Sequence, residues 1–90
     1  MAQIASLTLY HNADARPIIE AILADNPGVR VLNMPGAVKI DHDDALVVKR
    51  ASVEARLGRH WDPQEMNLVL ISMAGNLDED DDQFTVSWRH

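Results

Sequence analysis

The run AVKIDHDDALVVK, residues 37–49, is the strongest sign of a β-rich fold in this chain. Its two halves, Ala37-Val38-Lys39-Ile40-Asp41 and Ala45-Leu46-Val47-Val48-Lys49, carry the β-branched and aliphatic residues that favour strands. Asp41-His42-Asp43-Asp44 joins them, and Asp side chains satisfy the backbone amides of turns. We therefore predict two strands connected as a hairpin.

Shorter segments on both sides predict more strands. Residues 4–9, 29–32, 67–73 and 84–88 are apolar or alternate between apolar and polar side chains. Met34-Pro35-Gly36 predicts a turn. Residues 67–73 could also continue a helix, but Gly75 interrupts that pattern. We predict a strand there, with residues 84–88 as its hairpin partner.

Three segments predict helices. Apolar residues between 18 and 23 follow Pro17, with Asn12 or Asp14 as a cap, and Asn26-Pro27-Gly28 ends the pattern. Residues 52–58 predict a short helix from Ser52 to Gly58, and Asp62-Pro63-Gln64-Glu65 predicts a single helical turn with a capping box. The predicted fold class is α+β. We expect one small domain over residues 1–90, built mostly from antiparallel sheets with two or three short helices.

Composition limits the functions that this chain can have. Ninety residues allow one domain, and 47% hydrophobic residues allow that domain a core. Aromatic residues make up only 4%, so we expect Trp61 and Trp88 to be core residues. The net charge of −6 gives no electrostatic basis for binding nucleic acid or an anionic membrane surface. Met1-Ala2-Gln3-Ile4 lacks the pattern of a signal peptide, so we expect a cytoplasmic protein.

The run of five acidic residues from Asp78 to Asp82 allows three interpretations. A calcium loop would need glycine at its sixth position, where this chain has Gln83. A solvated loop between two strands is the simplest interpretation, because charge repulsion keeps such a run open. The third is an electrostatic guide toward a basic partner, which would act mainly on the association rate.

The residues offer no complete catalytic or cofactor site. Cysteine is absent, which excludes thiolate metal sites, Fe–S clusters and a Cys nucleophile. No two of the four histidines have the i, i+3 or i, i+4 spacing of helical metal ligands, and no serine lies in a Gly-x-Ser-x-Gly turn. We therefore predict a binding module without a cofactor, and not an enzyme.

Several apolar residues flank turns, where burial in one small core is difficult. They are Met34, Met66, Met73 and Leu77. Flexible methionines at such places suit either a docking surface or the filling of irregular core gaps, and periodicity alone leaves both open.

Three stretches together resemble a known family. They are Asp25-Asn26-Pro27, residues 53–62 (VEARLGRHWD), and Gln64-Glu65-Met66 followed by residues 71–82 (ISMAGNLDEDDD). The chain resembles the regulatory, or effector and coupling, proteins of bacterial multicomponent soluble di-iron monooxygenases, and most closely the phenol hydroxylase type. The resemblance runs from about Pro17 to Trp88.

The resemblance implies a partner and a role. Such proteins carry no cofactor, bind the hydroxylase that holds the di-iron centre, and promote NADH- and oxygen-dependent hydroxylation of aromatic compounds. A separate Fe–S flavoprotein reductase supplies the electrons. The resemblance places Ser72, Met73, Gly75 and Asn76 at the hydroxylase interface, with Asn33 and Met34 as weaker candidates.

Two other functions remain open on the residues alone. An acidic adaptor could bind a basic protein through Asp78–Asp82, in which case its affinity would fall steeply with salt. A small metal-binding protein could use the same run or Asp41, His42, Asp43 and Asp44.

Overall fold

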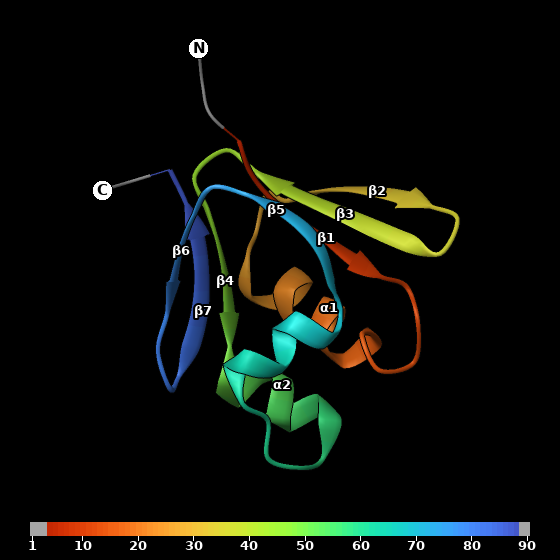
Figure 1. Ribbon diagram of the computed structural model, residues 1–90, viewed down its shortest axis with the longest axis vertical. Helices are drawn as coiled ribbons and strands as arrows, with labels where there is room; N and C mark the ends of the chain where they lie inside the picture. The colour runs from red at the N-terminus through yellow and green to blue at the C-terminus, as the bar shows by residue number, and fades with distance from the viewer. Residues whose placement is uncertain (1–3, 89–90) are drawn as a thin grey trace.

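Two antiparallel sheets and three helices make up the chain in a computed structural model that describes residues 4–88 (Figure 1). The four-stranded sheet has the order β2–β3–β1–β5, and the three-stranded sheet has the order β4–β7–β6. The predicted α+β class is confirmed. The elements are β1 (Ala5–Tyr10), α1 (Arg16–Asp25), β2 (Arg30–Met34), β3 (Ala37–His42), β4 (Ala45–Lys49), α2 (Arg50–Leu57), the 3-10 helix η1 (Pro63–Leu68), β5 (Leu70–Ala74), β6 (Asn76–Glu79) and β7 (Gln83–Ser87).

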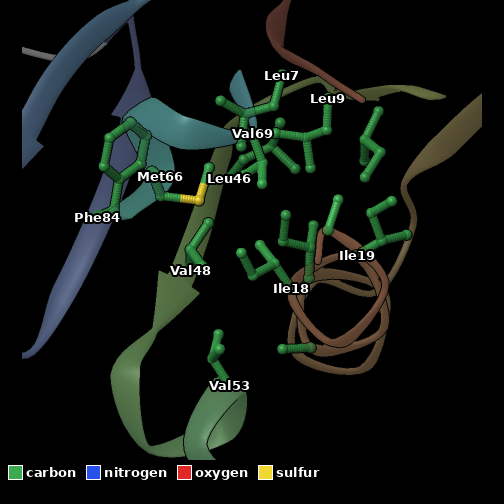
Figure 2. Close-up of a cluster of buried hydrophobic side chains, with 14 of the residues drawn as sticks. Leu7, Leu9, Ile18, Ile19, Leu46, Val48, Val53, Met66, Val69 and Phe84 are labelled. Atoms are coloured by element: carbon green, nitrogen blue, oxygen red, sulfur yellow. The ribbon is translucent and has the colours of Figure 1, made fainter. Parts of the chain in front are cut away.

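The core lies between the two sheets and the helices. Leu7 and Leu9 of β1 point from the four-stranded sheet toward side chains of α1, β4 and η1 (Figure 2). Phe84 and Trp61 are the fully buried aromatic residues among those described, and aliphatic side chains fill the rest. Trp88 is only half-buried, and its indole N–H donates a hydrogen bond to the Ile4 carbonyl at 2.9 Å. The core prediction is thus confirmed for Trp61 and was wrong for Trp88.

Residues 37–49 form two strands, but these strands do not pair with each other. β3 belongs to the four-stranded sheet and β4 to the three-stranded sheet, so the predicted hairpin is wrong. His42 shapes the corner between them. Its Nδ1 accepts the backbone N–H groups of Asp44 at 3.0 Å and Ala45 at 3.3 Å. Its Nε2 therefore carries the proton and donates to the Pro27 carbonyl at 3.0 Å.

The second predicted hairpin also has different partners. β5 pairs with β1, while β7 pairs with β4 and β6. Gly75 divides the apolar run, so that the start of the acidic run becomes the strand β6. The turn to β7 is held by Asp80, whose Oδ1 accepts the backbone N–H groups of Asp82 at 2.8 Å and Gln83 at 2.9 Å. All five acids are exposed. The predicted solvated loop is confirmed for residues 80–82 only, because Asp78 and Glu79 belong to β6.

Four of the five predicted helix ends are confirmed, among them the end of α1 at Asn26. Asn12 Oδ1 accepts the Ala15 N–H just before α1, and Gly58 ends α2 with φ +79°. Asp62 and Glu65 form the predicted capping box, although η1 is longer than the single turn expected. Ser52 does not begin α2, because the helix starts directly from β4 at Arg50.

The Glu54 carboxylate fastens the end of α2 to the following loop, which predicts a pH dependence. Its Oε2 accepts the Trp61 backbone N–H at 2.8 Å and lies 3.2 Å from Arg50 Nε and 3.1 Å from His60 Nδ1. The hydrogen bond from Trp61, aided by the charge and hydrogen bond of Arg50, lowers the pKa of Glu54 below its ordinary value of 4.5.

We expect the stability conferred by Glu54 to be complete above the unfolded pKa and to disappear as pH falls below it. The gap in unfolding midpoint between the wild type and Glu54→Gln should be constant from about pH 7 to 5 and should shrink toward about pH 3. Urea titrations across this range measure the gap. A gap that stays constant down to about pH 3 would contradict the assignment.

Candidate protein-interaction surface

Four of the nine large apolar side chains that are exposed among the described residues fall in one short segment of the chain. The other five are Ile4, Tyr10, Leu23, Val31 and Leu32. Among the described residues, Leu68, Ile71, Met73 and Leu77 are 77%, 45%, 39% and 43% exposed, and all four fall within residues 68–77. We call this segment the 68–77 ribbon. Concentrated exposed apolar surface on a small domain is typical of an interaction site, whereas isolated exposed residues are not.

The ribbon also forms an open edge of both sheets. β5 is the last strand of the four-stranded sheet, and β6 is the last strand of the three-stranded sheet. The chain passes from one to the other through Gly75 alone, so the two edges follow each other (Figure 1). The outward backbone N–H and C=O groups of an edge strand are available to a partner chain.

A bulge and the sheet edges explain why these apolar side chains are exposed. Thr8 of β1 pairs with Ser72 and Leu9 pairs with Leu70, which leaves Ile71 as an extra residue without a place in the ladder. Met73 lies across from the buried Leu7. Met73 therefore points to the core face of the sheet. Because β5 is the last strand, no further strand covers its outer side, and Met73 is partly exposed.

Gly75 is required by the close approach of β7. Its φ of +132° is a conformation that side chains oppose, and a Cβ there would lie 2.7 Å from Val86 Cγ1 and 3.2 Å from the Ser87 carbonyl oxygen. The glycine therefore has a structural role in the step between the sheets.

We expect Gly75→Ala to lower the free energy of unfolding by about 3 kcal/mol, through backbone strain together with overpacking. Gly36→Ala is the matched control, because Gly36 has φ +73° but open space around its Cβ position. It should cost only about 1 kcal/mol. Chemical unfolding measures both; equal losses would show that contact with Val86 has no effect.

The structure brings four of the six predicted interface residues together. Ser72, Met73, Gly75 and Asn76 are consecutive or nearly so on the ribbon, and Ser72, Met73 and Asn76 are exposed. Asn33 and Met34 lie on β2, at the opposite edge of the four-stranded sheet and three strand spacings away. That separation is about 14 Å. Asn33 and Met34 therefore lie at the opposite edge of the four-stranded sheet from Ser72 and Met73, while Asn76 belongs to the other sheet.

The structure also adds residues that the sequence reasoning missed. Leu68 and Ile71 belong to the ribbon, although both were assigned to a regular predicted strand. Met66, which was considered for a surface role, is fully buried in the core. Its side chain fills space beside Phe84, as Figure 2 shows, so the gap-filling interpretation is correct for this residue.

The polar corner at residues 41–44 is occupied by internal contacts. Burial works to raise the pKa of Asp41, but hydrogen bonds from Ser6 and Lys39 and the Lys39 charge outweigh it and lower that pKa. Asp43 is paired with Arg30 at 2.9 Å. Because both ring nitrogens of His42 are also engaged, this corner has the geometry of a structural clasp and not of a metal site.

Comparisons with known proteins agree on one family. The model of the MmoB/DmpM family matches residues 4–87. The stimulatory component DmpM of phenol 2-monooxygenase from Pseudomonas sp. (strain CF600) is 39% identical over 90 residues, which is the full length of both chains. No helix within residues 4–88 is long and apolar enough to cross a membrane.

Solved structures give the same result. A chain in a structure of a phenol hydroxylase–regulatory protein complex matches with a TM-score of 0.92 and 40% identity, covering 97% of this chain and 100% of that one. The regulatory protein B of soluble methane monooxygenase matches with a TM-score of 0.76 at 23% identity. That match covers 96% of this chain and 65% of the other, and it shows a shared fold.

Proposed function

Because the chain belongs to the MmoB/DmpM family, we propose that it is the regulatory component of a phenol hydroxylase-type monooxygenase and binds the di-iron hydroxylase component. The observation that carries this proposal is the full-length likeness, at 40% identity, to a chain in a phenol hydroxylase–regulatory protein complex. In this role the protein is not itself a catalyst. Electrons reach the hydroxylase from an Fe–S flavoprotein reductase, and the whole system works in the cytoplasm.

We place the hydroxylase contact on the 68–77 ribbon. Ser72, Met73 and Asn76 supply side chains to it, and Gly75 supplies half-buried backbone beside them. The open edges of β5 and β6 support this assignment, as do the exposed Ile71 and Leu77. Asn33 and Met34 remain predicted contacts on β2, the other edge of the four-stranded sheet. A partner that extends across this sheet from β5 would reach them.

The effect on the hydroxylase follows from binding alone. A protein without reactive groups changes its partner only by binding one conformation more tightly than another. A tenfold preference corresponds to about 1.4 kcal/mol, and a hundredfold preference to about 2.8 kcal/mol. We propose that this single domain binds best to the hydroxylase conformation that is competent for oxygen and substrate, and so increases its population.

The test is a titration of the protein into the hydroxylase with reductase, NADH and phenol. We expect product formation to rise to a plateau as the complex saturates, and we expect the protein alone to leave phenol unchanged. A flat titration would refute the proposal. The same titration at low and high salt separates the alternative function, because binding through Asp78–Asp82 would weaken steeply with salt whereas apolar docking would not.

A further inference from the structure

A hollow opens beside the ribbon, between the start of α1 and the end of η1. Its volume is about 250 Å3. Ile18, Trp61 and Val69 form its apolar base and are almost fully buried. Figure 2 shows Ile18 beside α1 and Val69 near Leu7 and Leu9 in the core cluster. Leu68, the most exposed large apolar side chain described, lies at its rim.

The charged groups of the hollow are placed at its mouth. Arg59 also lines it, and its guanidinium is held there by the Glu65 carboxylate at 3.3 Å and the His60 carbonyl at 2.7 Å. The arrangement is an apolar base with a polar rim, which is the anatomy of an anchor site in a protein interface. The volume is below the range of about 300–1,000 Å3 that small-molecule sites occupy, and it suits one or two side chains.

The ribbon needs such an extension. A stable interface of ordinary size takes about 20–30 residues from each partner, whereas the ribbon has ten. Leu68 and Val69 belong both to the hollow and to the segment that leads into β5, so the two surfaces are continuous.

We propose that the hollow receives an apolar side chain, aliphatic or aromatic, from the surface of the hydroxylase, and that Leu68 packs against it as a lid. This inference rests on the proposed function and extends it. The buried base would enclose that side chain in a preformed pocket without water. The residues that dominate the binding energy of interfaces are found in such desolvated pockets. The hollow thereby fixes the position of the domain on the hydroxylase, while the ribbon supplies the broader contact.

Ala13→Phe tests the hollow by filling it. Ala13 is exposed and lines the hollow, and Ala24→Phe makes the same change at an exposed position of α1 that does not line it. We expect Ala13→Phe to raise the protein concentration needed for half-maximal stimulation by about tenfold or more, which is the loss typical of an interface anchor. Ala24→Phe should leave it within about twofold. Should Ala13→Phe lower the melting temperature, Ala13→Leu replaces it in the same assay.

A second variant and a separate readout complete the test. Leu68→Gln removes the lid at a highly exposed position, so we expect normal melting and about a fivefold loss of affinity. If the wild type stimulates the hydroxylase but the Ala13 variants bind within about twofold of it, the hollow is not an anchor and this inference is overturned. If the wild type fails to stimulate at all, the proposed function itself is wrong.

Discussion

Asn26→Ala is expected to lower the free energy of unfolding by about 3 kcal/mol and the melting temperature by more than about 10 °C. Asn26 is 6% exposed and ends α1. Its Nδ2 donates to the Ile22 and Val47 carbonyls, each at 2.8 Å, and its Oδ1 accepts the Val47 N–H at 2.9 Å. Alanine leaves the half-buried N–H and C=O groups of Val47 without these partners, and the loss includes their desolvation cost. The Ile22 carbonyl keeps the backbone N–H of residue 26, at 3.0 Å.

Two further variants make this prediction specific. Asn26→Asp keeps the acceptor for Val47 but removes both donated hydrogen bonds, so we expect a loss at least as large as that of alanine. Asn33→Ala removes an exposed amide from an edge strand and should change stability by less than about 0.5 kcal/mol. Thermal and urea unfolding measure all three. Equal stability of Asn26→Ala and Asn33→Ala would show that the hydrogen bonds from Asn26 to Val47, which join α1 to β4, contribute nothing to stability.

Ile71→Asp is expected to raise the concentration for half-maximal stimulation of the hydroxylase by about thirtyfold or more. Ile71 is the extra residue of the β5 bulge and is 45% exposed, so its replacement leaves the core and the strand ladder intact. An aspartate there loses the apolar contact and carries an unpaired charge into the interface, which costs more than truncation does.

Leu23→Asp is the matched control for this prediction. Leu23 is 41% exposed on α1, away from the ribbon, and the change in charge and size is nearly the same. It should leave stimulation within about twofold of the wild type. Melting temperatures of both variants separate loss of binding from loss of fold. A folded Ile71→Asp that stimulates as well as Leu23→Asp would remove the ribbon from the interface.

Local signals in this sequence predicted local structure well. Pro17 and Asn12 mark the start of α1, Gly58 marks the end of α2, and the spacing of Asp62 and Glu65 gives the capping box. Each depends on backbone groups only a few residues apart, so neighbouring sequence contains the whole cause. The α+β class followed from the same signals.

Strand pairing could not be predicted in the same way. Residues 41–44 resemble a hairpin turn. However, the His42 side chain hydrogen-bonds to the carbonyl of Pro27, in the loop after α1, and the chain continues into the second sheet. Gly75 looks like the end of one strand, but the constraint on it comes from Val86, eleven residues later. Pairing of this kind depends on contacts between distant residues that periodicity does not encode.

Only part of the candidate surface could be predicted, because the exposure of its other residues also depends on contacts that periodicity does not encode. Ser72, Met73, Gly75 and Asn76 came from the resemblance to the family. In the structure Ser72 and Met73 lie on the edge strand β5, Asn76 lies on the edge strand β6, and Gly75 joins the two. Ile71 was missed because a bulge breaks the alternation that its position would otherwise follow. Leu68 was missed because its exposure depends on where η1 ends.

The ratio of hydroxylated product to NADH consumed, measured with hydroxylase and reductase in the presence and absence of this protein, tests the central claim most directly. If the protein acts by holding the hydroxylase in a competent conformation, the ratio should rise toward one as the complex saturates, and Ile71→Asp should reach the same ratio only at higher concentration. A ratio and a turnover rate that do not change with added protein would contradict the account.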